Sequence, residues 1–479
     1  MRFFGALAFL AIFVGCRVTE PVNFVFILAD DLGYMDVGAY NPDTFYETPN
    51  IDRLADEGVR FTQGYAAAPV CSPTRASIMT GLYPSRMATT DYFGAPQPDG
   101  VSRHWTRNKP LLPARYEPQL PHNEVTVAEA LSAAGYRTFW AGKWHLGGEG
   151  SYPEDHGFEV NRGGWEAGGP YGRGNYFVPY DNPRLEDGPE GEHLPARLAA
   201  ETVRFIGENQ DQPFMAFLSF YSVHTPLMAR PDLQEKYEAK PALPSMWGTE
   251  GDRQVRLTQN HAVYAAMVEA MDQAVGMVLA ALDELDLARN TVVIFTSDNG
   301  GLSTSEGHPT SNLPLRAGKG WMYEGGIREP LLMRWPALLK GGRVEDTPVT
   351  SPDFMPTLLQ IARLPEPDFT DGVSLLPLLI ERRAPERDLY WHYPHYGNQG
   401  GSPSSAVRRG NWKLIRFYED DREELYDLAA DVSESENHAS NQPEIRNELS
   451  ISLDTWLDQV NARLPTPNPD NLNGEQTDE

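Results

Sequence analysis

Short apolar runs alternate with helical patterns along most of this chain. The apolar runs have the length and composition of strands buried in a sheet, and they lie at residues 22–29, 59–65, 136–140, 214–221 and 291–296. Helix signals stand between them. Thr48 and Gly58 bracket one helix that starts at Pro49, and residues 258–288 carry Ala, Met, Val and Leu at helical spacing. This alternation predicts an α/β fold with helices on both faces of a sheet.

Polar residues follow several of the predicted strands directly. Asp30 and Asp31 end the first strand, His224 lies just after the fourth, and Asp298 and Asn299 follow the fifth. In open α/β sheets, binding sites form at the carboxyl ends of the strands. We therefore expect these separate segments to meet at one edge of the sheet.

The pattern changes after about residue 375. Residues 381–387 form a charged, proline-containing linker, and residues 407–417 and 424–428 are typical of hairpin strands. These features predict a small C-terminal unit over residues 385–464. Residues 465–479 are mostly Pro, Asn, Asp and Glu without an apolar pattern, which predicts a disordered tail.

The first 16 residues have the pattern of an export signal. Arg2 precedes an apolar run over residues 3–14, which is shorter than the ~20 residues that span a bilayer. The run ends in Phe13-Val14-Gly15-Cys16, which resembles a bacterial lipobox with Cys16 as a candidate lipid anchor. Cleaved secretion and an uncleaved anchor are the alternatives. The protein is thus predicted to be exported, as a periplasmic, outer-membrane lipoprotein or secreted bacterial protein.

Charge and cysteine content narrow the function classes. The formal net charge is −27, which argues against nucleic acid as a partner. The two cysteines, Cys16 and Cys71, are too few for a disulfide-stapled fold. Any anionic substrate would need a site that is locally positive on this acidic chain.

The carboxylates at the strand ends suggest a metal site. Asp30, Asp31, Asp298 and Asn299 offer hard oxygen ligands, which suit Ca²⁺ or Mg²⁺. Ordinary turn capping by the same residues is the alternative. Adjacent carboxylates after a buried strand repel each other, however, and a bound cation would relieve that repulsion.

Cys71 opens a distinctive segment. Cys71-Ser72-Pro73-Thr74-Arg75 is followed by residues 76–81, which end in Thr-Gly. We expect a helix here, with Ser72 as its cap and Pro73 in its first turn. The segment resembles the C-x-P-x-R signature of the formylglycine-dependent sulfatase family, in which a maturation enzyme converts the cysteine to formylglycine. Further segments match that family in order: Asp30-Asp31, residues 142–147, 224–226, 297–300, 315–320 and 323–328.

The resemblance implies a fold and an activity. The fold would be alkaline-phosphatase-like: a large mixed, mostly parallel sheet between helices over residues 20–380, and a small C-terminal subdomain with an antiparallel sheet. The activity would be hydrolysis of O-sulfate esters, with a sulfated carbohydrate or polysaccharide as the expected substrate. Calcium, with magnesium the lesser candidate, would be held by Asp30, Asp31, residue 71, Asp298 and Asn299.

The resemblance also implies roles for the charged residues. Arg75, Lys143 and Lys319 would neutralise charge on the sulfuryl group, which supplies the local positive field that the acidic chain needs. His224 would protonate the leaving alcohol and His145 would serve the formylglycine as a base. The hydrated aldehyde offers one hydroxyl to attack sulfur and a second to expel sulfate, so one hard step becomes two.

Residues on loops near these signatures or at the junction with the C-terminal unit are candidates for substrate binding. We expect sugar or sulfate contacts from His104, Trp105, Arg173, His308, Arg316 and His392, with Arg162, Trp391 and His395 as further candidates. Ordinary packing is the alternative for each of them.

Three other functions fit parts of the pattern. A phosphonate or phosphate ester hydrolase of the same superfamily can share the formylglycine. A surface lipoprotein that binds glycans without catalysis would not need the intact Cys71 signature. A cysteine hydrolase that pairs Cys71 with a histidine would leave the carboxylates unexplained.

Overall fold

The computed structural model describes residues 21–367 and 369–472. The predicted signal peptide, the candidate lipid anchor Cys16 and the last residues of the predicted tail, 473–479, lie outside this range.

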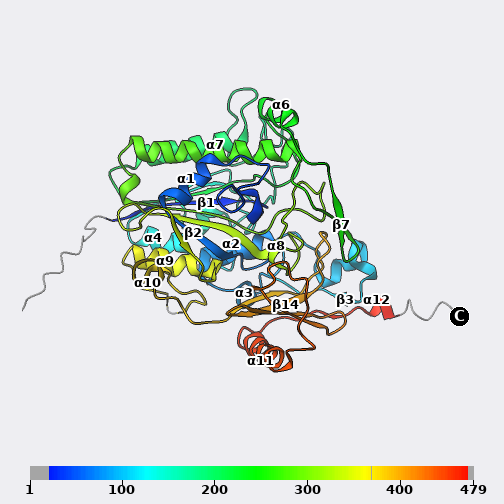
Figure 1. Cartoon of the computed structure of the whole chain (residues 1–479). Helices are drawn as coiled ribbons and strands as arrows, with labels where there is room; N and C mark the ends of the chain where they lie inside the picture. The colour runs from blue at the N-terminus through cyan, green and yellow to red at the C-terminus, as the bar shows by residue number, and fades with distance from the viewer. Residues whose placement is uncertain (1–20, 368, 473–479) are drawn as a thin grey trace, which may run out of the picture.

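A mixed, mostly parallel sheet forms the centre of the described chain (Figure 1). Within those residues it has nine strands in the order β11-β2-β10-β9-β1-β6-β4-β5, with β12 beside β2, and β10 is antiparallel to both of its neighbours. The strands are β1 (Asn23–Ala29), β2 (Val59–Tyr65), β4 (Arg137–Gly142), β5 (Val160–Arg162), β6 (Phe214–Ser219), β9 (Thr291–Ser297), β10 (Arg328–Arg334), β11 (Arg343–Glu345) and β12 (Val349–Thr350).

Helices cover both faces of this sheet, which explains the apolar strands. In β1, Val25 and Ile27 pack into one hydrophobic cluster while Phe24 and Phe26 pack into the cluster on the opposite face. The first face carries α1 (Pro49–Glu57), α5 (Leu194–Glu208), α6 (Pro231–Ala239) and α7 (Ala262–Glu284). The second carries α2 (Cys71–Thr80), α3 (Pro84–Met87), α4 (Val127–Ala133), α9 (Phe354–Ile361) and α10 (Leu376–Glu381).

The longest helix, α7, lies across the first face (Figure 1). In the described part of the chain, it alone has the length and apolar composition of a membrane span. Its packing against α1, α5 and α6 accounts for that composition.

A second, smaller sheet packs against the main unit. It is antiparallel in the order β13-β14-β15-β16, formed by β13 (Leu389–Tyr393), β14 (Ser404–Arg409), β15 (Trp412–Phe417) and β16 (Glu423–Asp427). Its inner face packs on Tyr65 and Trp321 of the main unit, and its outer face is covered by α11 (Pro443–Gln459). The predicted fold class is confirmed by this arrangement of a large mixed sheet and a small antiparallel one.

Short elements complete the described chain. They are β3 (Leu111–Leu112), β7 (Trp247–Glu250), β8 (Arg253–Arg256), α8 (Glu324–Ile327), β17 (Thr466–Pro467) and α12 (Pro469–Leu472). Because β17 pairs with β3 of the main unit, the prediction of disorder from residue 465 is wrong for residues 465–472. A backbone pairing with a distant segment leaves no apolar pattern in the sequence.

The helix at the signature segment starts earlier than expected. It begins at Cys71, and Val70 stands at the N-cap without a side-chain cap. Ser72 does not cap the helix; its hydroxyl accepts a hydrogen bond from the backbone N–H of Phe93 at 3.0 Å. Cys71 therefore occupies the first turn, where the backbone N–H groups lack intrahelical acceptors.

Candidate active site

The carboxylates converge because β1 and β9 are parallel neighbours. Ala29 lies opposite Ser297 in the register, so the residues that follow each strand come side by side. The backbone N–H of Asp31 donates to the Asp298 carboxylate at 3.2 Å, and Asn299 donates to Asp31 at 2.8 Å. The expected meeting of these segments at the carboxyl edge thus occurs.

Cys71 joins this acidic group from the start of α2. Ligand atoms of Asp30, Asp31, Cys71 and Asp298 all lie within 4.8 Å of one another, and all four residues are buried. Burial raises the pKa of the Cys71 thiol to about 12, so an unmodified cysteine here is neutral. Four potential ligands from three segments thus face one small volume.

The donor set fits a hard cation. Burial raises the pKa of Asp30, and Lys143 offsets this only in part. The side-chain Nδ2 of Asn299 is hydrogen-bonded to Asp31, whereas its buried Oδ1 has no hydrogen-bond partner within the described residues. A buried acceptor without a donor costs free energy unless something binds it. Three carboxylates and this free oxygen suit a divalent cation such as Ca²⁺ or Mg²⁺.

Two buried lysines face the carboxylates. Lys143 Nζ lies 2.7 Å from Asp30, and Lys319 Nζ lies 2.7 Å from Asp31. Burial alone would lower the pKa of each lysine, but the facing carboxylates outweigh it and raise both values. Both ammonium groups therefore stay charged where an anion would bind.

Arg75 reaches the same place from α2. Its Nε donates to Asp298 at 2.7 Å, and its Nη1 donates to Ser219 and to the backbone carbonyl of Lys143. These bonds fix the guanidinium plane. Its Nη2 lies 3.7 Å from Asp30, beyond hydrogen-bonding distance, so this nitrogen keeps donor capacity for a further acceptor.

Two histidines flank Cys71. The Nε2–H of His145 donates to the carbonyl of Phe93 at 3.0 Å, because a carbonyl can only accept, and its buried Nδ1 stays unbonded among the described side chains. By the same reasoning, Nδ1–H of His224 donates to Thr225 at 2.8 Å. Burial and the nearby Lys319 lower the pKa of His224 to about 4. Both rings thus present one free nitrogen.

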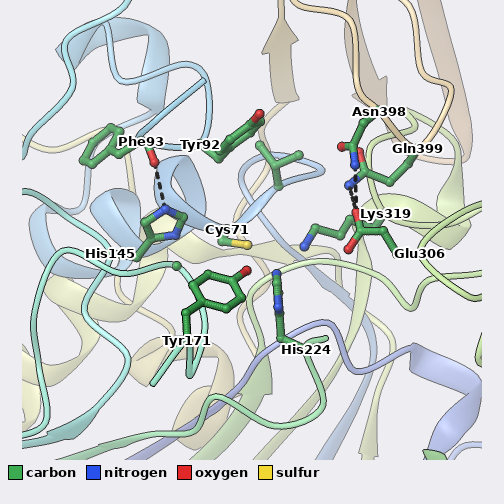
Figure 2. A pocket seen from close by; sticks show the side chains of 12 residues that line it. Cys71, Tyr92, Phe93, His145, Tyr171, His224, Glu306, Lys319, Asn398 and Gln399 are labelled. Atoms are coloured by element: carbon green, nitrogen blue, oxygen red, sulfur yellow. Dashed lines mark hydrogen bonds between the residues drawn. The ribbon is translucent and has the colours of Figure 1, made fainter. Parts of the chain in front are cut away.

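These groups open into one cavity of about 320 Å³ (Figure 2). Cys71 lines this cavity between His145 on one side and Lys319 on the other. The lining consists of Val70, Cys71, Tyr92, Phe93, His145, Gly168, Tyr171, His224, Glu306, Lys319, Asn398 and Gln399. Asp30, Asp31 and Asp298 lie beside Cys71 of this lining, and the two remaining cations, Lys143 and Arg75, are hydrogen-bonded to Asp30 and Asp298.

The six candidate substrate-binding residues lie elsewhere. His104 bonds to Thr106, and Trp105 beside it is 39% exposed. Arg173 pairs with Asp181 at 2.7 Å on the surface. In the described part of the chain, the lining of this cavity includes none of the three.

The other three have partners in the packing. The ring of His308 lies 5.6 Å from that of Trp247, and Arg316 pairs with Glu250 at 2.7 Å. His392 is buried in β13, where both ring nitrogens are hydrogen-bonded. The further candidates are likewise engaged, as shown by the contacts of Arg162 with Glu201, Trp391 with Ala66 and His395 with Thr90.

Sequence reasoning missed most of the cavity wall. Tyr92, Tyr171 and Glu306 come from three loops, and Asn398 and Gln399 come from the loop between β13 and β14. These loops carry no periodic pattern and no signature. They come together when the small sheet packs against the main unit.

The wall segment at Tyr92 is anchored by a buried carboxyl group. Asp91 accepts from the backbone N–H of Tyr92 at 2.9 Å and from the hydroxyl of Tyr393 at 3.2 Å, and it lies 3.3 Å from His395. Burial raises its pKa to about 8. The folded state therefore keeps a proton on Asp91 that the unfolded chain releases near its ordinary value of ~4.

Because of this pKa shift, the stability of the folded protein is expected to change with pH in a definite direction. Between about pH 4 and 8 the folded state binds more protons, so Asp91 lowers stability as pH rises, by at most about 1.4 kcal/mol per pH unit. We expect Asp91→Asn to gain stability relative to the parent protein from pH 5 to pH 8 in urea unfolding. Asp99→Asn, at an exposed site, is the matched control. A difference between Asp91→Asn and parent that does not change with pH would contradict the assignment.

Residues 22–364 match the Sulfatase family. The chain belongs to this family. Residues 317–462 also match the family described as N-sulphoglucosamine sulphohydrolase, C-terminal. The protein is therefore a sulfatase that hydrolyses sulfate esters, in a family that uses a metal ion and formylglycine, and the buried group around Cys71 fits that chemistry.

Individual sulfatases align over most of the chain. A sulfatase of Formosa agariphila is 32% identical over 92% of this chain and 90% of its own length. Human arylsulfatase A is 33% identical over 85% of this chain and 77% of its own. Rat steryl-sulfatase is 33% identical over 78% and 72%, respectively.

The fold also matches that of solved structures. The crystal structure of Ps i-CgsB in complex with k-i-k-neocarrahexaose superposes with a TM-score of 0.74 and 27% identity, over 91% of this chain and 93% of that one. A match of that extent includes part of the small C-terminal unit as well as the main one.

Proposed function

We propose that this sulfatase removes an O-sulfate group from a carbohydrate, with Cys71 converted to formylglycine and Ca²⁺ held beside it. The observation that carries the proposal is the position of Cys71. It starts a buried helix at the floor of a cavity and faces three carboxylates and three cations. Burial keeps a thiol in that place protonated, whereas a hydrated aldehyde supplies a hydroxyl nucleophile.

Calcium is the proposed cation because the ligands are all oxygens. Asp30, Asp31, Asp298 and the free Oδ1 of Asn299 would hold it together with residue 71. Ca²⁺ takes about 6–8 oxygens with loose geometry, whereas Mg²⁺ demands a near-ideal octahedron. A divalent ion there would polarise the sulfate oxygens and favour a deprotonated nucleophile.

The remaining catalytic roles are proposed for side chains of the protein. Arg75, Lys143 and Lys319 would hold the sulfuryl oxygens and neutralise the charge that develops on them. His224 would give a proton to the leaving alcohol from Nε2, which faces the cavity and lies 3.8 Å from Asp31. The ring must first take up that proton, and the negative charges of Asp31 and of a bound sulfate favour its uptake. His145, with its unbonded Nδ1 on the opposite side, would act as the base at residue 71.

A carbohydrate is the proposed leaving group. Ps i-CgsB, which is 27% identical, was solved in complex with k-i-k-neocarrahexaose. The cavity here offers two tyrosines, Tyr92 and Tyr171, together with the polar side chains Glu306, Asn398 and Gln399. Aromatic faces and hydrogen-bonding groups are the usual surfaces for sugar rings. The predicted export signal would deliver such an enzyme to extracellular polysaccharide.

The test measures both the conversion of Cys71 to formylglycine and the release of sulfate. The protein is made with a formylglycine-generating maturation enzyme, and we expect the peptide with residue 71 to be lighter than the cysteine form by about 18 Da. The modified protein should release sulfate from sulfated sugars and from an aryl sulfate, and Cys71→Ala should release none. Asp99→Asn, at an exposed ion pair with Arg115, is the control and should be modified and active like the parent protein.

Three results would overturn the proposal. Sulfate release from protein that keeps an unmodified thiol at residue 71 would contradict the nucleophile. Faster hydrolysis of the matched aryl phosphate than of the aryl sulfate would favour the phosphate or phosphonate esterase alternative. Full glycan binding without turnover by modified protein would favour a glycan-binding surface protein.

A further inference from the structure

A carboxylate stands in the wall of this anion-binding cavity. Glu306 lies on the segment between β9 and α8 and lines the cavity together with Lys319 and His224 (Figure 2). Its backbone is in the left-handed region, with φ of 52°, which is uncommon for a residue with a side chain. A negative charge here opposes binding of the sulfate group itself. We therefore expect Glu306 to contact another part of the substrate.

Glu306 is held in place through one of its two oxygens. Oε1 accepts from Asn398 at 2.9 Å and from Gln399 at 2.8 Å. Among the residues that the structure describes, Oε2 has only a long contact, 3.4 Å, from the hydroxyl of Thr225. A carboxylate oxygen accepts two hydrogen bonds readily. Oε2 therefore keeps acceptor capacity while the rest of the group is fixed.

The nearby cation is committed elsewhere. Lys319 shares the cavity lining with Glu306, but its ammonium group lies 2.7 Å from Asp31. Glu306 acts on Lys319 and His224 as a longer-range charge that raises the pKa of each. No ion pair within the described residues neutralises Glu306, so its charge remains open to the substrate. Its two amide tethers come from the C-terminal part of the chain, so the small unit helps to shape this side of the cavity.

We propose that Glu306 selects the leaving group by charge. This inference rests on the proposed function and names its substrate class: a sugar that presents an uncharged hydroxyl to Oε2 beside the scissile sulfate. A second sulfate or a carboxylate at that position would be repelled by the Glu306 carboxylate. It would also offer no hydroxyl to donate a hydrogen bond to Oε2. Sites built to bind a substrate hydroxyl reject analogues that lack it strongly, and like charges in contact suppress wrong partners.

The experiment uses matched sugar pairs and the formylglycine-bearing protein. Galactose monosulfates are each compared with the disulfate that carries a second sulfate on the adjacent hydroxyl, and an aryl sulfate without sugar hydroxyls reports on the sulfatase activity itself. We expect the parent protein to favour the monosulfate by about 100-fold or more in kcat/KM. Glu306→Gln should reduce this preference at least about tenfold, mainly through faster turnover of the disulfate.

Controls separate charge selection from other effects. Glu284→Gln removes the same charge from an exposed position at the end of α7 and should leave the preference unchanged. Raising ionic strength should weaken the preference of the parent protein, because salt screens the repulsion, and should have little effect on that of Glu306→Gln. This salt comparison in the parent keeps the test decisive even where the variant folds poorly.

The outcomes are distinct. An equal rate on mono- and disulfates in the parent protein, or the same salt-sensitive preference in Glu306→Gln, would overturn the charge-selection inference and leave the sulfatase activity intact. Absence of turnover on every substrate, including the aryl sulfate, would overturn the proposed function and the inference with it.

Discussion

Asp298→Asn is expected to weaken calcium binding by about 100-fold and to reduce sulfate release at limiting calcium by about 1,000-fold. Asp298 contributes a carboxylate to the group of four ligands within 4.8 Å, and the same carboxylate fixes Arg75 at 2.7 Å. The asparagine keeps the size of the side chain but removes its charge. It thus weakens the attraction for the cation and loosens the guanidinium that would hold sulfate.

The measurement combines calorimetric calcium titration with sulfate release over a range of calcium concentrations. Excess calcium should restore only part of the activity of Asp298→Asn, because the bond to Arg75 is not restored by metal. Asp99→Asn, the same change at an exposed ion pair with Arg115, should bind and turn over like the parent. Calcium affinity equal to that of the parent would remove Asp298 from the ligand set.

The fold and the floor of the site were predictable from sequence because both depend on local patterns. Buried parallel strands give continuous apolar runs, and the residues that end such strands must meet at one edge. Asp30, Asp31, Asp298 and Asn299 follow from that rule, since Ala29 pairs with Ser297. Cys71 and Arg75 are predictable because both belong to one short signature in the sequence.

The walls of the site were not predictable in the same way. Glu306, Asn398 and Gln399 are separated by about ninety residues and meet only because the small sheet packs against the main unit. The sequence places His392 at the junction with the C-terminal unit, where a loop residue could reach the substrate. In the structure that residue lies within β13, buried and hydrogen-bonded to Ser405 and to the carbonyl of Arg463, outside the cavity lining.

Burial of the cationic side chains explains how an acidic chain can bind an anionic substrate. The formal net charge is −27, and salt screens charges that are exposed to solvent beyond about 8–10 Å. The three cations at the cavity are buried and paired, so their field acts at short range in a medium of lower dielectric constant. A divalent ion among the carboxylates would free part of this positive charge for sulfate.

His224→Ala is expected to discriminate between leaving groups. For a sugar sulfate, whose alcohol leaves poorly without a proton, the loss in kcat should be about 100- to 10,000-fold. For 4-nitrophenyl sulfate the phenolate leaves unaided, and the loss should be roughly tenfold or less. The position of the ring supports this role: its Nδ1–H is bonded to Thr225, which turns Nε2 toward the cavity.

The ratio of the two losses is the diagnostic quantity, because damage to the fold or to the metal site lowers both rates alike. His438→Ala, a substitution on the outer side of the small unit where the ring packs against Trp412, is the matched control and should leave both rates near those of the parent. Equal losses on both substrates in His224→Ala would show that the histidine positions the site rather than donating a proton. In that case His145, whose Nδ1 is unbonded among the described side chains, becomes the group to test by the same pair of substrates.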